Sequence, residues 1–171
     1  MAKQLKIYFY SMDGVGHVNA CVGVAQELAN RQHKITFLNS RSYKGHFLKF
    51  GFEEIVVEPE DDSGRPAEDP IKAMADSVLK SGLFNNKTAM EKAKLMKGPG
   101  KDIMKRIFDK SVKQFPLIAK AIDDNKPDLV VVDHFFVPPC IVHSGIPWVS
   151  LVSACPLPLY DSDKLPPFKS G

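Results

Sequence analysis

The chain has 171 residues, of which 44% are hydrophobic and 25% are charged, and its net charge is +3. This length and composition predict one soluble globular domain, while the dispersed lysines argue against a nucleic-acid-binding surface. No apolar run approaches the roughly 18 residues of a membrane span, and the N-terminus lacks the apolar stretch of a secretory signal, so we expect a cytoplasmic protein.

The first predicted elements are a strand, a glycine turn and a helix. Residues 7–10 form a short apolar run of strand length. Gly14 and Gly16 allow a tight turn and leave room for a ligand beside the backbone. Apolar residues then recur at helical spacing over residues 18–28. His17 therefore stands where the turn becomes the helix, at the carboxyl edge of the strand, where open α/β sheets bind ligands.

Four further strands are predicted from short runs of apolar and β-branched residues. The runs of the fourth and fifth strands, residues 129–132 and 148–152, are nearly continuous in apolar residues. This is typical of parallel strands covered on both faces, so we expect these two strands to be buried. The four runs are residues 34–38, 53–58, 129–132 and 148–152.

The segments around the third strand predict one helix, one loop and one interrupted helix. Residues 43–50 predict a single short helix that Gly51 stops. Residues 59–70 are acidic and rich in proline, which indicates a surface loop. Residues 71–97 have apolar positions at helical spacing with breaks between them.

The second half of the chain predicts two helices and a tail. The sequence at 98–100 is a helix stop, after which Asp102 is expected to cap a helix that Pro116 kinks or splits. A short helix is expected at 138–142, where two prolines open it. Residues 156–171 carry four prolines and no periodicity, which predicts an extended tail or linker.

Strands that alternate with helices predict a doubly wound parallel sheet, a Rossmann-like α/β domain over residues 1–155. In the common strand order 3-2-1-4-5, strands one and four are neighbours. His17 follows the former and Asp133 ends the latter, so the two side chains are expected to meet. Such a pair is suited to general-base catalysis, because the carboxylate stabilises the imidazolium that proton capture forms. The alternative is that His17 is merely solvated and Asp133 caps the next element.

A dinucleotide site is a weaker alternative at the same turn. Gly14 and Gly16 begin a GxGxxG pattern, but Asn19 stands at its third glycine. Asn39 stands at the end of the second strand, where an NAD-binding domain has an acidic residue. The sequence therefore gives NAD poor support and NADP little more.

Other chemistries lack a sequence signature. The chain has no P-loop, no GxSxG elbow and no spacing of histidines and cysteines that indicates a metal site. The three cysteines lie in apolar contexts without a CxxC pair, which favours reduced packing thiols over nucleophiles. The residues weighed here are His33, His46, His134, His143, Cys21, Cys140 and Cys155.

Several motifs resemble the N-terminal half of the family 1 UDP-sugar-dependent glycosyltransferases. Residues 16–19 (GHVN) are similar to the family's GHxNP, and residues 25–29 (AQELA) to its leucine–alanine helix end. Residues 33–37 (HKITF) follow its GHxVT, and residues 127–133 (PDLVVVD) its fourth strand. The likeness continues in residues 145–149 (GIPWV) and Ser153.

The resemblance implies the N-terminal half of a GT-B fold and an inverting transfer of a hexose from a UDP-sugar to a hydroxyl of a small lipophilic acceptor. His17 corresponds to the family's general base and Asp133 to its partner. UDP-sugar is a co-substrate, and neither a cofactor nor a metal is required. The acceptor pocket is expected in the loops at 82–97 and 135–160, with the candidates Gly14, Gly16, Phe135, Phe136, Pro156 and Leu157.

The chain departs from the family at three points. Ala20 replaces a proline and Gln32 a glycine, and the donor-binding C-terminal half does not follow. The implied enzyme therefore needs a second half in cis or in trans. A standalone module that binds a small lipophilic molecule without turnover is the alternative.

Overall fold

The computed structural model describes residues 3–59 and 99–154, together with residues 75–76, 79–80, 82, 85–88, 90–92 and 94. All but the first residue of the loop expected at 59–70 lies outside the described residues, as do most of the helix expected at 71–97 and the tail expected at 156–171. The predicted domain boundary at 155 lies outside them as well.

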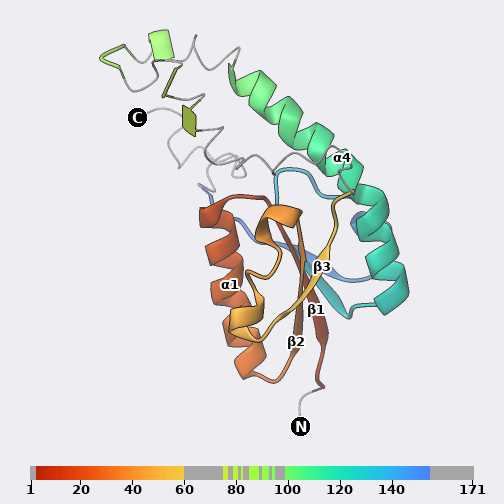
Figure 1. Cartoon of the computed structure of the whole chain (residues 1–171). Helices are drawn as coiled ribbons and strands as arrows, with labels where there is room; N and C mark the ends of the chain where they lie inside the picture. Colours follow the sequence, from red (N-terminus) through yellow and green to blue (C-terminus); the bar gives the residue numbers. More distant parts are fainter. Residues whose placement is uncertain are drawn as a thin grey trace, which may run out of the picture.

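A five-stranded parallel sheet forms the centre of the described structure, and its strand order β3-β2-β1-β4-β5 confirms the predicted order (Figure 1). β1 pairs with β2 on one side and β4 on the other, so the first and fourth strands are neighbours. The strands are β1 (Lys6–Ser11), β2 (Lys34–Asn39), β3 (Glu53–Val56), β4 (Leu129–Asp133) and β5 (Trp148–Ser150).

Helices cover both faces of this sheet, as a doubly wound fold requires. The helix α1 (Val15–Asn30) packs on one face, and α4 (Pro99–Asn125) lies on the other (Figure 1). The short helix α5 (Pro139–Val142) packs beside α4, in agreement with the sequence. No helix among the described residues is long and apolar enough to cross a membrane.

The strand residues alternate between the two faces, with a period of two. In β1, Ile7 and Phe9 join the core under α1, while Tyr8 and Tyr10 join the core under α4. In β4, Val131 faces α1, whereas Val130 and Val132 face α4. Asp133, the next residue with the parity of Val131, is accordingly directed to the α1 face.

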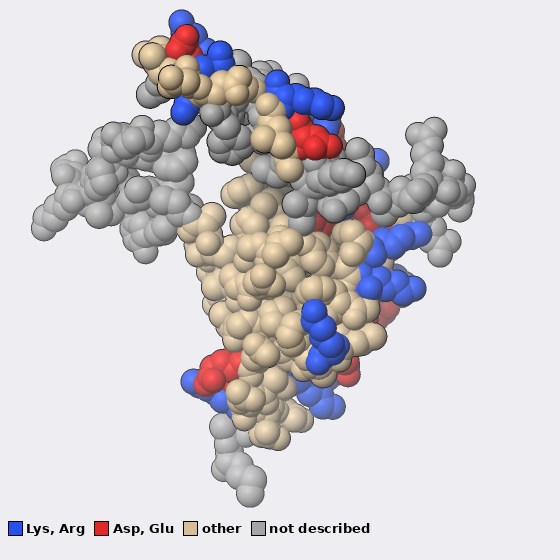
Figure 2. Space-filling view, turned by 60° about the vertical axis from the view of Figure 1, so that its left-hand side comes forward, with Lys and Arg blue, Asp and Glu red and all other residues tan. Residues whose placement is uncertain are grey.

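The surface around α1 carries little charge. The helix contains one acidic residue, Glu27, and no lysine or arginine. Figure 2 shows this side of the molecule as mostly uncharged, with basic atoms in the lower half of the area and further charged side chains at its rim. A net charge of +3 is therefore not concentrated on this side of the molecule.

The single helix predicted at 43–50 is wrong. The chain instead forms two 3₁₀ turns, η1 (Arg41–Tyr43) and η2 (Leu48–Phe50). Gly45, which has φ +82°, interrupts any continuous helix between them. Gly51 ends the second turn with φ +77°, as expected.

The prediction for the start of α4 is also wrong. The helix begins at Pro99 and includes Asp102, so Asp102 does not cap it. Proline is well suited to the first helical position, where its missing N–H has no partner to lose. Pro116 lies inside the helix without splitting it.

The fifth strand is present but is not buried. Trp148 is 37% exposed and Val149 is 49% exposed, and β4 is the only described strand that pairs with β5. An edge strand leaves one side open, so its apolar run gave a misleading indication of burial.

Candidate active site

His17 and Asp133, which are far apart in the sequence, meet at the carboxyl edge of the sheet. Nδ1 of His17 lies 3.1 Å from Oδ2 of Asp133. The imidazole is 17% exposed and the carboxylate 5% exposed. The pair is thus largely shielded from water while the ring retains access to the surface.

The sheet register explains this contact. Ser11, the last residue of β1, aligns with Asp133, the last residue of β4. The backbone N–H of Met12 then donates to the carbonyl of Asp133 over 2.9 Å, which fixes the start of the turn to the end of β4. The turn leads into α1, whose first turn carries His17 over the face to which Asp133 is directed.

A second oxygen contacts the same ring nitrogen. Oγ of Ser153 lies 2.9 Å from Nδ1 of His17. No described residue hydrogen-bonds Nε2 of His17. In a Ser-His-Asp triad the serine and the aspartate contact different ring nitrogens, so this arrangement does not activate Ser153 as a nucleophile. It suits a histidine whose Nε2 receives a proton from a bound molecule.

Two predicted pocket residues pack against the His17 ring. The Phe135 ring meets it edge-on with the ring centroids 6.1 Å apart, and Phe135 is 52% exposed. Gly14 lies so close that an added Cβ would sit 3.3 Å from Cδ2 of His17. The same atom at Gly16 would have no neighbour within 4 Å. Gly14 therefore accommodates the ring, while Gly16 borders open space.

Of the remaining pocket candidates, the structure describes Phe136 but not Pro156 or Leu157. The Phe136 ring packs instead against Phe108 of α4, with the centroids 5.2 Å apart. Pro156 and Leu157 lie outside the described residues. The structure thus assembles His17, Asp133, Phe135 and Gly14 at one place and directs Phe136 to the opposite face.

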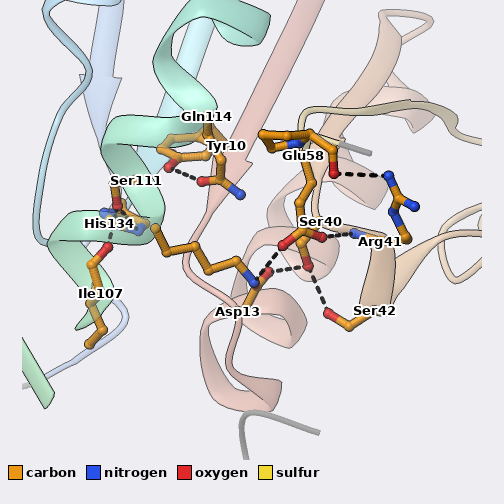
Figure 3. Close-up of polar contacts among 12 residues, drawn as sticks. Tyr10, Asp13, Ser40, Arg41, Ser42, Glu58, Ile107, Ser111, Gln114 and His134 are labelled. Atoms are coloured by element: carbon orange, nitrogen blue, oxygen red, sulfur yellow. Dashed lines mark hydrogen bonds and ion pairs between the residues drawn. The ribbon is translucent and has the colours of Figure 1, made fainter. Parts of the chain in front are cut away.

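The opposite face holds a second, fully bonded histidine. His134 stacks on Tyr10, with the centroids 5.1 Å apart, and its Nδ1 accepts a 3.0 Å hydrogen bond from the N–H of Phe136. Nε2 lies 3.4 Å from Oγ of Ser111, which itself donates to the carbonyl of Ile107 (Figure 3). Nε2 of His134 is therefore the protonated nitrogen and the donor to Ser111.

Burial holds His134 in this neutral form. The loss of hydration lowers the pKa of His134 to about 4, although Asp13 and Asp133 favour its protonation. Burial likewise raises the pKa of Tyr10, whose hydroxyl donates to Oε1 of Gln114 over 2.8 Å. These groups stabilise the fold and offer no free proton acceptor.

A charged network ties α4 to the ends of three strands (Figure 3). Lys110 of α4 bridges Asp13 over 2.6 Å and Glu58 over 3.2 Å. Asp13 also accepts from Oγ of Ser40, which follows β2, and Glu58 accepts from the N–H of Arg41. Burial opposes the charge of Lys110, but the two carboxylates raise the pKa of its ammonium.

The geometry gives the alternative chemistries no support. The close approach that Gly14 permits is to His17, and the Asn39 amide donates to the carbonyl of Tyr43. Burial raises the pKa of Cys21 to about 12 and also raises that of Cys140, so both thiols stay protonated. Cys155 lies outside the described residues. The described residues contain no group of three side chains suited to a metal ion.

Sequence reasoning placed the His17–Asp133 pair but missed Ser153 as a site residue, along with the networks around His134 and Lys110. One signal was available for Ser153, because a polar residue just after the fifth strand falls on the same sheet edge as Asp133. Nothing in the sequence indicated that Lys110, in the middle of a long helix, would reach Asp13 and Glu58.

The chain is similar in sequence to one curated protein. No model of a known protein family matches the chain. Among curated proteins, demethyllactenocin mycarosyltransferase of Streptomyces fradiae is 25% identical over 127 residues, which cover 74% of this chain and 24% of that protein. The chain therefore spans about a quarter of the length of this relative.

Solved structures of three glycosyltransferases are similar to the chain. The calicheamicin glycosyltransferase gives a TM-score of 0.53 at 23% identity, covering 87% of this chain and 32% of its own. SnogD from Streptomyces nogalater gives 0.52 at 15% identity, with coverages of 87% and 33%. The glycotransferase of kitacinnamycin gives 0.51 at 19% identity, with coverages of 87% and 30%. The chain thus has a Rossmann-like α/β fold that corresponds to part of a GT-B glycosyltransferase.

Proposed function

We propose that this chain is the acceptor-binding half of a glycosyltransferase that transfers a hexose from a UDP-sugar to a hydroxyl of a small lipophilic molecule. The observation that carries the proposal is the 3.1 Å contact between His17 and Asp133, made through Nδ1 alone. The named activities of the curated relative and of the similar structures support the reaction class.

In the proposed mechanism His17 is the general base. Nε2 takes the proton of the acceptor hydroxyl, and the oxygen attacks C1 of the sugar. The bond between C1 and the phosphate oxygen breaks, and UDP leaves with the electron pair, so the anomeric centre inverts. Asp133 stabilises the imidazolium, because its carboxylate lies on Nδ1 in a shielded position where charge pairing is strong.

The lipophilic character of the acceptor rests on Phe135. Its ring is exposed beside His17 and offers an apolar surface to a molecule whose hydroxyl reaches Nε2. The donor is proposed to bind a second half, supplied in cis or by a partner chain. The coverage of about a third of each similar structure supports this.

Substitution of the base tests the proposal in a protein that carries both halves. His17→Ala should lower turnover about 10²-fold or more, which is the usual contribution of a general base. His33→Ala is the matched control, because His33 precedes β2 and so lies at the amino edge of the sheet, opposite the carboxyl edge that carries His17. Near-normal turnover of His17→Ala would contradict the proposal.

A second experiment separates the enzyme from a binding module. The 171-residue chain alone should bind a phenolic or terpenoid probe, yet it should release little UDP from UDP-sugar. Addition of a donor-binding half should restore transfer. If that addition gives no transfer while the probe still binds, the chain is a binding module. Robust UDP release by the chain alone would show that the donor site is already present.

A further inference from the structure

We propose that Ser153 is a positioning residue for His17, whose hydroxyl accepts a second hydrogen bond from Nδ1 beside Asp133. The two oxygens lie 2.9 Å and 3.1 Å from this one nitrogen. They come from different strands, since Asp133 ends β4 and Ser153 follows β5 by three residues. The inference rests on the proposed role of His17 as a base.

Hydrogen-bond chemistry fixes the roles at Nδ1. An ionised carboxylate only accepts, so Asp133 requires a hydrogen on Nδ1. Ser153 then accepts from the same N–H, in a hydrogen bond shared by two oxygens. The hydrogen on Nδ1 leaves the lone pair on Nε2, which is the atom that must take a proton from the acceptor. Both contacts therefore favour the tautomer that catalysis needs.

The second contact also restrains the orientation of the ring. A half-turn about the Cβ–Cγ bond would exchange Nδ1 with a carbon, and both hydrogen bonds would be lost together. Gly14 leaves room for Cδ2 on the other edge of the ring, where an added Cβ would lie 3.3 Å away. Ser153 is exposed and Asp133 is buried, so one oxygen at Nδ1 comes from the surface of the domain and the other from its interior.

The effect of Ser153 should depend on Asp133. Without the carboxylate, the Ser153 hydroxyl is free to donate to a bare Nδ1, which places the hydrogen on Nε2. That tautomer cannot accept the proton of the acceptor hydroxyl. Ser153 therefore assists His17 when Asp133 is present and opposes it in Asp133→Ala.

Nitrogen-15 NMR of the His17 ring in the 171-residue chain tests the positioning without any sugar transfer. The unaltered chain should give two well-separated ring nitrogen signals, with the hydrogen on Nδ1. Ser153→Ala should move the two signals toward each other, because Asp133 alone favours the Nδ1 tautomer less strongly than the two oxygens together, and Ser153→Thr should restore the separation. Ser150→Ala is the control, since no described residue hydrogen-bonds the exposed Ser150 side chain. Unchanged signals in Ser153→Ala would overturn the proposal.

Kinetics in a protein with both halves give the second readout. Ser153→Ala should lower kcat roughly 3- to 10-fold, as the loss of one hydrogen bond predicts, with KM for both substrates within about twofold. In an Asp133→Ala background the same change should leave kcat equal or raise it. A further 3- to 10-fold fall in that background would overturn the proposal. Absence of transfer in the unaltered protein would refute the proposed function, and the NMR result would still decide the role of Ser153.

Discussion

The two faces of the sheet edge hold two histidines with opposite properties. His17 lies on the α1 face, where described residues hydrogen-bond only its Nδ1. His134 lies on the α4 face, where both of its ring nitrogens are hydrogen-bonded and its ring is stacked on Tyr10. Their partners Asp133 and Phe136 are within three residues of each other in the chain. A free ring nitrogen, and not the position of a histidine in the sequence, is therefore what makes His17 the candidate base and His134 a structural residue.

The largest expected difference is in turnover. Asp133→Asn should lower kcat of a protein with both halves by about 10² or more, because an amide can donate to Nδ1 and stabilise the wrong tautomer of His17. His134→Gln should change kcat by less than about threefold, since His134 contacts no reacting group. Turnover is measured by UDP release. Comparable losses of kcat in the two variants would show that His17 and His134 do not differ in their importance for the reaction.

Acid stability should distinguish the histidines next. The pKa of His134 lies near 4 in the fold and near 6.5 in the unfolded chain. Between these values the unfolded chain binds the extra proton, so stability is full above about pH 6.5 and falls as the pH approaches 4. From pH 7 to pH 4.5 the expected loss from this group is about 2 kcal/mol.

Chemical denaturation at the two pH values measures this loss. His134→Gln should be less stable at pH 7 but should lose about 2 kcal/mol less on acidification than the unaltered chain. An identical pH dependence in the two proteins would show that His134 is not held neutral by the fold.

The charged network on the α4 face should contribute a smaller stability effect. Lys110→Met leaves Asp13 and Glu58 without their shared cation. Because the Lys110 side chain is 37% exposed, we expect a cost of about 1–2 kcal/mol, below that of a fully buried pair. Lys105→Met is the control on the same helix, as its pair with Asp109 is exposed and should cost at most about 0.5 kcal/mol. Equal costs in urea denaturation would rule out a special role for Lys110.

The smallest expected effect concerns the packing of the His17 ring. Gly14→Ala places a methyl group 3.3 Å from Cδ2 of His17, so the ring must shift by a few tenths of an ångström. We expect kcat to fall about 2- to 5-fold, on the scale of a slightly misplaced base. Gly23→Ala, at a helical position with nothing within 4 Å, should leave kcat unchanged. An equal fall of kcat in both variants would show that the fall comes from a general effect on α1 and not from displacement of the His17 ring.

The sequence was sufficient to predict the sheet order and the central pair. Both follow from regular patterns, because parallel strands share one carboxyl edge and strands one and four are neighbours in this order. The alternation within β4 could also have predicted that Asp133 and His134 face opposite sides. The sheet order, the central pair and the alternation in β4 can be predicted because they follow from local periodicity and from a strand order that many domains share.

The errors arose where tertiary structure overrides local pattern. The aromatic spacing at 43–50 reflects packing of Phe47 on Phe37, with the centroids 3.9 Å apart, and not a helix. The apolar run of β5 belongs to an edge strand, which pairs with β4 alone among the described strands. Such contacts depend on partners that sequence spacing does not identify.

The alternation along β4 has an evolutionary consequence. A single inserted or deleted residue in this strand would turn Asp133 and His134 to the opposite faces of the sheet. The Asp133 carboxylate would then enter the apolar core under α4, and the His134 imidazole would face His17 of α1. Substitutions at Val130, Val131 or Val132 leave Asp133 and His134 on their present faces of the sheet, whereas a change in the length of the strand does not. In proteins that evolve from this chain, the residues of β4 should therefore vary while the length of the strand stays the same.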